Sequence, residues 1–103
     1  MNGASGFLLM SYELEFKESA LKEWHKLDKG IRELFKKRLA ERLLVPRVES
    51  ARLSAMPDCY KIKLRDVGYR LVYQVKETAL IIEVIAVGKR ENNQVYRLAK
   101  ERL

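Results

Sequence analysis

The chain has 103 residues, of which 48% are hydrophobic and 34% charged, and its 21 Lys and Arg exceed its 14 Asp and Glu to give a net charge of +7. A chain of this length buries about two thirds of its unfolded surface, which suffices for one modest core and excludes dinucleotide-binding, barrel and multidomain architectures. Its apolar content is too high for a disordered polycation, and no apolar run approaches the roughly 20 residues of a membrane span. The positive charge favours an anionic partner.

The chain has one cysteine, Cys59, and one histidine, His25. A lone cysteine cannot form an intramolecular disulfide and suits a reducing cytoplasm, which is the expected location. One histidine cannot complete a Cys/His metal site, so we expect neither a metal nor a cofactor. We expect Cys59 to be a small buried hydrophobe and His25 to lie on the surface.

Residues 1–9 lack the charged start and the long apolar run of a signal peptide. Met10 follows as an alternative start, so we interpret residues 1–9 as a disordered extension and residues 10–103 as the single domain. Residues 12–16 then alternate apolar and acidic side chains, which predicts a strand with Tyr12 and Phe16 on one face.

Two amphipathic helices follow the first strand. From Lys17 the apolar residues recur with a period of 3.6, and Asp28-Lys29-Gly30 ends this first helix. Pro46 ends the second, because proline cannot continue the backbone hydrogen bonds. We expect the two helices to form an antiparallel hairpin and residues 45–58 to be an irregular loop. The predicted apolar stripes are Ala20, Leu21, Trp24 and Leu27 in the first helix, and Ile31, Leu34, Phe35, Leu39 and Leu43 in the second.

A β-hairpin is predicted from two alternating runs, residues 60–65 and 69–75, which flank Gly68. A register that closes the turn on Val67-Gly68 keeps apolar residues opposite apolar residues. The pairs that it predicts are Leu64 with Leu71, Ile62 with Tyr73, Arg65 with Arg70, Lys63 with Val72, and Lys61 with Gln74. The four cations of these pairs then share one surface.

Residues 79–87 are apolar at nearly every position, which is typical of a strand that is covered on both faces. Residues 91–103 have Val95, Leu98 and Ala99 at helical spacing and predict a terminal helix. The predicted fold is a small α+β domain with an N-terminal strand, a helix hairpin, a three-stranded antiparallel meander and a C-terminal helix. We expect the helices to pack on one face of the sheet.

The shared basic surface suits RNA cleavage by a neighbouring 2′-OH, which needs a base for that hydroxyl and stabilisation of the phosphoryl charge. With His25 elsewhere, the candidate base is Lys61 or Lys63, because nearby cations lower the pKa of a lysine. Arg70 and Arg90 stay charged and suit the phosphoryl oxygens. Tyr96 can stack on a base or orient the 2′-OH. A basic face that serves only solubility remains the alternative interpretation.

Four blocks of the sequence resemble the RelE toxins of bacterial toxin–antitoxin systems, collinearly from Met10 to the C-terminus. They are LKEW at 21–24, MPDCYKIKLR at 56–65, GYRLVYQV at 68–75 and VGKRE at 87–91, followed by VY at 95–96. The resemblance implies an endoribonuclease that enters the A site of the 70S ribosome and cleaves the mRNA codon there by 2′-OH attack. It also implies silencing by a RelB-type antitoxin, and a fold related to microbial ribonucleases.

The resemblance also assigns roles to individual residues. The family's catalytic positions fall on Lys61, Lys63, Arg70, Arg90 and Tyr96, and the further cations Arg65 and Lys89 are expected to bind RNA. One departure is Ser54, where relatives carry a basic residue. No metal ligand and no membrane contact are implied, and DNA contact is expected only through the toxin–antitoxin complex.

Two other functions are compatible with the same fold. A ParE-like relative poisons DNA gyrase without cutting RNA, although such a protein has no need of the five catalytic positions. A pure binding module would use the basic face only for electrostatic attraction, and its binding would be salt-sensitive without strand scission.

Overall fold

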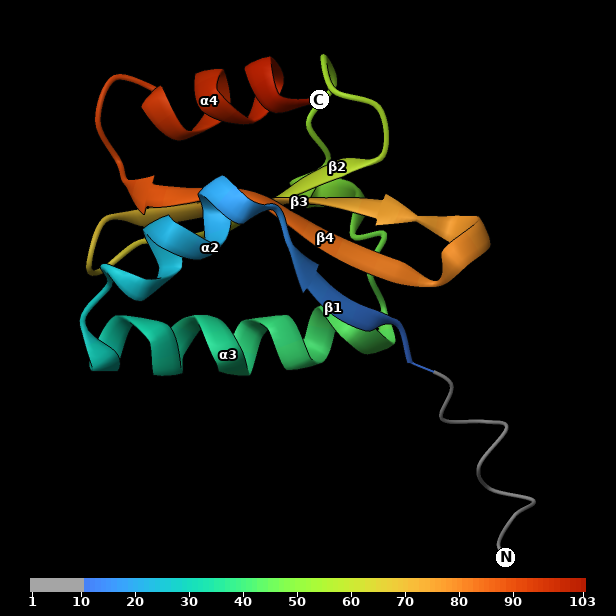
Figure 1. The fold of residues 1–103 in the computed structure, drawn as a ribbon, viewed down its shortest axis with the longest axis horizontal. Helices are drawn as coiled ribbons and strands as arrows, with labels where there is room; N and C mark the ends of the chain where they lie inside the picture. The colour runs from blue at the N-terminus through green and yellow to red at the C-terminus, as the bar shows by residue number, and fades with distance from the viewer. Residues whose placement is uncertain (1–10) are drawn as a thin grey trace, which may run out of the picture.

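A computed structural model describes residues 11–103, so the interpretation of residues 1–9 lies outside the described residues. The elements are β1 (Glu13–Phe16), α2 (Glu18–His25), α3 (Lys29–Leu44), the 3-10 helix η2 (Glu49–Ala51), β2 (Cys59–Leu64), β3 (Tyr69–Lys76), the 3-10 helix η3 (Glu77–Ala79), β4 (Ile81–Lys89) and α4 (Gln94–Arg102) (Figure 1). This order confirms the predicted α+β arrangement. Within residues 11–103, no helix combines the length and the apolar character needed to cross a membrane.

The four strands form one sheet in the order β1-β4-β3-β2. Strands β2, β3 and β4 make the predicted antiparallel meander, and β1 pairs in parallel with β4. Strand β2 stands at the end of this order, so it is an edge strand among the described strands, and it carries Lys61 and Lys63.

Helices cover both faces of the sheet, so the expectation that they share one face is wrong. Helices α2 and α3 pack against Leu71 and Ile82 in one apolar cluster. Helix α4 packs against Val72 and Ile85 in a second cluster, and Figure 1 shows α4 and α3 on opposite sides of the sheet. The physical reason is that β4 is apolar at nearly every position and β3 carries apolar residues on both of its faces, Leu71 on one and Val72 on the other, so each face of the sheet needs cover.

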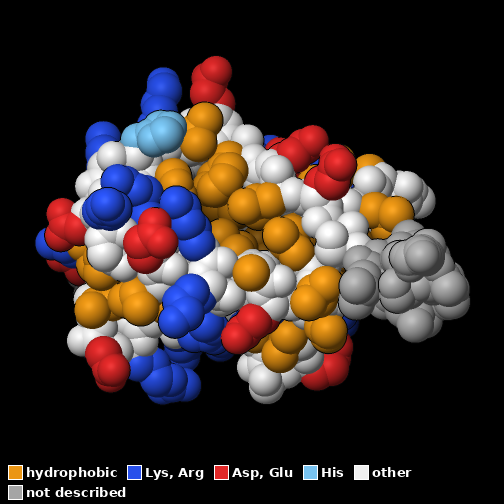
Figure 2. All heavy atoms as spheres, turned by 90° about the horizontal axis from the view of Figure 1, so that it is seen from below, with side chains coloured by type: hydrophobic (Ala, Val, Ile, Leu, Met, Phe, Trp, Pro, Cys, Tyr) orange, Lys and Arg blue, Asp and Glu red, His pale blue; other side chains and the backbone are white. Residues whose placement is uncertain are grey.

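The predicted helix hairpin is confirmed. Helices α2 and α3 run in opposite directions in Figure 1, and the Trp24 ring lies 6.2 Å from the Phe35 ring between centroids. The predicted stripes are wrong at two positions, since Leu21 is 38% exposed and Leu34 is 43% exposed. Figure 2 views this face and shows hydrophobic side chains in a band across it, with Lys and Arg gathered on one side of the band.

The β2–β3 hairpin has the predicted faces but a register shifted by two residues. Lys63 pairs with Arg70, and Leu64 pairs with Tyr69. The turn therefore contains residues 65–68, and the Gly68 N–H donates a 2.9 Å hydrogen bond to the Leu64 carbonyl. A two-residue turn closing on Val67-Gly68 commonly needs positive φ at both residues, which a β-branched valine resists. Only Gly68, with φ of +72°, adopts it here.

This longer turn changes the expected basic surface. A shift by two residues keeps every side chain on its face, so Lys61, Lys63 and Arg70 still share a surface. Arg65 leaves the sheet and lies exposed in the turn instead of opposite Arg70. The expected cross-strand pairing of Arg65 is therefore wrong.

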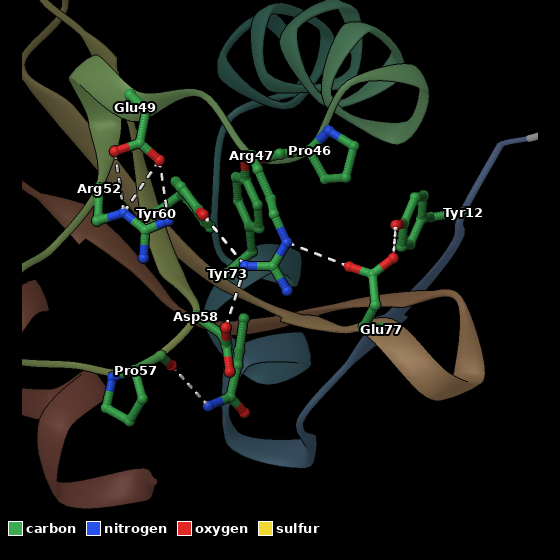
Figure 3. Close-up of polar contacts among 11 residues, drawn as sticks. Tyr12, Pro46, Arg47, Glu49, Arg52, Pro57, Asp58, Tyr60, Tyr73 and Glu77 are labelled. Atoms are coloured by element: carbon green, nitrogen blue, oxygen red, sulfur yellow. Dashed lines mark hydrogen bonds and ion pairs between the residues drawn. The ribbon is translucent and has the colours of Figure 1, made fainter.

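A polar network fixes the opposite end of these strands (Figure 3). The Arg47 guanidinium donates to Glu77 Oε1 at 3.1 Å, to Asp58 Oδ1 at 3.0 Å and to the Tyr60 hydroxyl at 3.2 Å. Tyr12 donates to the same Glu77 carboxylate, which connects the start of β1 to the network. The loop before β2, which we expected to be irregular, is in this way attached to β2 through Tyr60 and to the 3-10 helix η3 through Glu77.

Candidate functional site

One cleft collects most of the predicted site residues. We call it the α4 cleft, because it lies where the N-terminal end of α4 meets the ends of β2, β3 and β4. It has a volume of about 130 Å³ and is lined by Lys63, Arg70, Lys89, Arg90, Glu91, Asn93, Gln94, Val95 and Tyr96. Five of these residues were predicted as site residues: Lys63, Arg70, Lys89, Arg90 and Tyr96. The carboxylate of Glu91 and the side-chain amides of Asn93 and Gln94 were not predicted.

Two glycines, Gly68 and Gly88, lie where the elements around the α4 cleft meet. The Arg90 N–H donates a 2.7 Å hydrogen bond to the Gly68 carbonyl, which joins the β2–β3 turn to the end of β4. Gly88 pairs with Arg70 and presents no side chain to it. A Cβ at Gly88 would lie 3.4 Å from Val95 Cγ2, an ordinary van der Waals distance, so the start of α4 lies against the end of β4 at this point.

Arg70 is a nearly buried cation that the described part of the chain leaves without a counter-ion. It is only 7% exposed, and its NH1 donates a 3.0 Å hydrogen bond to the neighbouring Tyr69 carbonyl. Among residues 11–103, no carboxylate lies within ion-pair distance of it. Since a buried charge is costly unless it is paired, an anion that enters the cleft is stabilised there.

Lys63 is the lysine of β2 that lines the α4 cleft, and its surroundings favour the neutral amine. The positive charge of Lys61 is the main factor that lowers the pKa of Lys63, followed by partial desolvation and by the charges of Arg65 and Arg70. Lysines with a lowered pKa are usable as bases near neutral pH. Lys61 lies on the same face of β2, two residues away, but it does not line the α4 cleft.

Tyr96 projects from α4 into the same cleft. Its hydroxyl is buried and has no hydrogen-bond partner within the described part of the chain. A buried hydroxyl without a hydrogen-bond partner destabilises the fold. A ligand in the cleft that forms a hydrogen bond with the Tyr96 hydroxyl removes this cost, and its binding is therefore favoured.

A second, larger cleft lies on the other side of β2, between this strand and α3. We call it the edge cleft; its volume is about 480 Å³. It is lined by Leu34, Arg38, Arg42, Ser50, Ala51, Lys61, Lys63, Leu64, Arg65, Asp66 and Val67. The predicted residues Lys61 and Arg65 therefore lie here, and Lys63 borders both clefts.

Arg38 and Arg42 connect α3 to the edge of β2, and neither was predicted from the sequence as a site residue. Arg42 is 7% exposed, and its NH1 donates to the Lys61 carbonyl at 3.1 Å and to the Tyr73 hydroxyl at 2.9 Å. Arg38 NH1 donates to the Lys63 carbonyl at 3.3 Å. The available signal was the position of Arg42, which follows Phe35 and Leu39 along the buried stripe of the helix.

Cys59 is buried, as expected, on the face of the sheet that α4 covers. Burial raises the pKa of its thiol to about 11, and the nearby charge of Asp58 adds to the effect. Since only the thiolate is nucleophilic, Cys59 takes no part in the chemistry of this site at neutral pH.

Comparison with known proteins gives concordant matches. A family model described as ParE toxin of type II toxin-antitoxin system, parDE, matches residues 14–94. The mRNA interferase toxin RelE of Escherichia coli K12 is 55% identical over 94 residues, which cover 91% of this chain and 99% of that protein.

Two solved structures resemble this fold. An E. coli RelE toxin in the free state, with two arginines replaced by alanine, has a TM-score of 0.85 at 54% identity, covering 91% of this chain and 99% of that chain. The toxin of the intact E. coli RelBE toxin–antitoxin complex has a TM-score of 0.77 at 56% identity, covering 80% of this chain and 100% of that chain.

Proposed function

Because the chain belongs to the RelE family of toxins, within the RelE/ParE superfamily of type II toxin–antitoxin systems, we propose that it is an mRNA interferase. It cleaves the codon in the ribosomal A site and so inhibits translation in the cytoplasm. A RelB-type antitoxin neutralises it, by analogy with the RelBE complex that its fold resembles. Contact with DNA occurs only through that toxin–antitoxin complex.

The reaction that fits the α4 cleft is an internal displacement at phosphorus. The 2′-oxygen forms a bond to the adjacent phosphorus, and the bond between phosphorus and the 5′-oxygen breaks. The products are a 2′,3′-cyclic phosphate and a 5′-hydroxyl. The cleft must accept the proton of the 2′-OH, stabilise the phosphorane oxygens and neutralise the departing oxygen.

The residues of the cleft match these three tasks. Lys63, with its lowered pKa, accepts the 2′-OH proton, and Lys61 keeps that pKa low. Arg70 contacts the phosphorane oxygens, and Arg90 balances the charge on the 5′-oxygen until this oxygen takes a proton from water. Tyr96 orients the 2′-OH with its unpartnered hydroxyl or stacks on a base. The remaining cations, Arg65 and Lys89, bind the RNA backbone.

One observation carries the proposal: Arg70 is nearly buried and has no counter-ion among residues 11–103, in a cleft that also holds Lys63, Arg90 and Tyr96. Like charges held together destabilise a fold, so their convergence is favourable only when an anion neutralises them. A phosphodiester supplies that anion, and its displacement by the neighbouring 2′-oxygen is the reaction that these side chains are suited to catalyse.

Two substitutions test the assignment. Lys63→Ala and Arg90→Ala are each expected to slow message cleavage by about 100- to 1000-fold, because each removes a group that acts in the transition state. The matched control is Lys100→Ala, which removes an exposed cation of α4 away from the cleft. Cleavage is measured by primer extension, and urea unfolding checks that all three variants fold. Wild-type rates in both cleft variants would overturn the assignment.

The match to the ParE toxin model favours a second candidate function, a gyrase poison that does not cut RNA. The same variants separate the two functions. For an mRNA interferase, Lys63→Ala and Arg90→Ala abolish growth arrest together with cleavage. For a gyrase poison, growth arrest persists in both variants and no message is cut.

A further inference from the structure

We propose that the edge cleft is a second RNA subsite, which binds a phosphodiester of single-stranded RNA beside the α4 cleft. This inference rests on the proposed ribonuclease function and extends its binding site. Lys63 borders both clefts, so a strand whose reacting phosphate lies in the α4 cleft continues over the edge of β2 into the edge cleft.

The charge of the edge cleft suits a phosphodiester. Its lining contains five cations, Arg38, Arg42, Lys61, Lys63 and Arg65, against the single carboxylate of Asp66. Within residues 11–103 only one of these cations is in an ion pair: Arg38 Nε lies 4.0 Å from Oε1 of Glu41, whose side chain is 74% exposed. Such a surface pair contributes little, so the cleft keeps nearly its whole positive charge for a ligand.

The edge of β2 is already occupied in a way that disfavours a peptide as the ligand. An added strand would pair with the free carbonyls of β2, yet the Lys61 and Lys63 carbonyls accept hydrogen bonds from Arg42 and Arg38. The backbone of Tyr60 is also paired already, because it forms an antiparallel β-bridge with Arg52. Strand addition is therefore blocked along the part of β2 that faces the cleft.

The two arginines keep donors available for an anion. A guanidinium has five N–H donors, and the hydrogen bonds of Arg38 and Arg42 to β2 and Tyr73 use NH1 alone. Their planar geometry matches two oxygens of one phosphate. Leu34 and Val67 also line the cleft and are 43% and 42% exposed, which offers apolar contact to the bases on either side of that phosphate.

The test compares Arg38→Gln with Lys37→Gln. Both variants lose one positive charge from α3, but Lys37 does not line the edge cleft. The first probe is a 2′-O-methyl RNA of about eight nucleotides, which spans both clefts and cannot be cut because its nucleophile is blocked. Binding is measured by fluorescence anisotropy over a range of NaCl concentrations. The second probe is a programmed ribosome with an empty A site, titrated over the same salt range.

The salt dependence identifies a lost phosphate contact. For single strands, the slope of log K against log salt changes by about 0.7 for each phosphate contacted. Arg38→Gln is expected to reduce that slope by about 0.7 on the free oligonucleotide, whereas Lys37→Gln leaves it at the wild-type value.

The two probes distinguish a phosphate of the substrate strand from a phosphate of ribosomal RNA. They also distinguish failure of the edge-cleft inference from failure of the proposed function. A reduced slope on the ribosome alone assigns the subsite to ribosomal RNA instead of the substrate strand. Equal slopes for Arg38→Gln and Lys37→Gln on both probes would overturn the edge-cleft inference. A wild-type protein that binds RNA with this salt dependence but never cleaves it would overturn the proposed function and leave the subsite standing.

Discussion

Replacement of Arg102 by methionine is expected to loosen α4, the helix that carries Tyr96. Arg102 forms a two-pronged ion pair with Glu23 of α2, with NH1 to Oε1 at 2.9 Å and NH2 to Oε2 at 2.8 Å. The same NH1 donates to the Ile85 carbonyl of β4 at 2.9 Å. These contacts attach the C-terminal end of α4 to the rest of the fold and raise the pKa of Arg102, chiefly through the hydrogen bonds to Glu23.

The magnitude follows from the burial of the pair. The side chains of Arg102 and Glu23 are 19% and 24% exposed, so solvent screens the pair only in part. Methionine keeps most of the aliphatic contact but leaves Glu23 with one partner, the Val87 N–H at 3.2 Å. Loss of charge-assisted hydrogen bonds from a partly buried pair costs about 2 to 3 kcal/mol of unfolding free energy. For a domain of this size that lowers Tm by roughly 10 to 20 °C.

Urea unfolding of Arg102→Met measures this loss, with Lys100→Met as the control for removal of an exposed cation from the same helix. We also expect amide hydrogen exchange in α4 to accelerate and message cleavage to fall, because Tyr96 is held less firmly in the α4 cleft. An unfolding midpoint equal to that of Lys100→Met would refute the reasoning from the ion pair. A double-mutant cycle with Glu23→Gln isolates the pairwise energy.

Three further predictions concern buried or perturbed groups. Arg42→Met removes the hydrogen bonds to the Lys61 carbonyl and the Tyr73 hydroxyl, and it should lower the unfolding free energy by about 2 kcal/mol in urea titrations. Cys59, with its pKa raised to about 11 and no exposed surface, should react with a thiol reagent at neutral pH only at the rate of unfolding, and faster labelling would show that the thiol is accessible. The pKa of Lys63 is lowered mainly by the charge of Lys61. Removal of that charge in Lys61→Met favours the charged amine, so the NMR titration of Lys63 should move to higher pH. The rising limb of the cleavage rate against pH should move to higher pH with it. An unchanged titration would remove the electrostatic basis for Lys63 as the base.

The faces of the hairpin were predictable, whereas its register was not. Alternation along residues 60–65 and 69–75 determines which side chains share a face, so Lys61, Lys63 and Arg70 were correctly grouped. It does not determine which residues pair, because a shift by two residues leaves every face unchanged. The position of Arg65 depended on the turn geometry, which the left-handed conformation of Gly68 determines.

The apolar pattern of β4 indicated cover on both faces without indicating which helix lies on each. Helix α4 has a short stripe, formed by Val95 and Ala99, that fits either face equally well. The edge cleft was unpredictable for a related reason. Arg42 lies on the buried stripe of α3, where a charged residue is not expected from the sequence. It can be buried because its guanidinium donates hydrogen bonds to the Lys61 carbonyl of β2 and to the Tyr73 hydroxyl of β3.

The most direct test of the central claim is primer extension on a defined message, incubated with the purified protein with and without programmed ribosomes that have an empty A site. Membership of the RelE family and the cations that converge in the α4 cleft predict cleavage within the A-site codon, and only when ribosomes are present. A folded protein that leaves the message intact under both conditions, while it still blocks growth, would contradict the account.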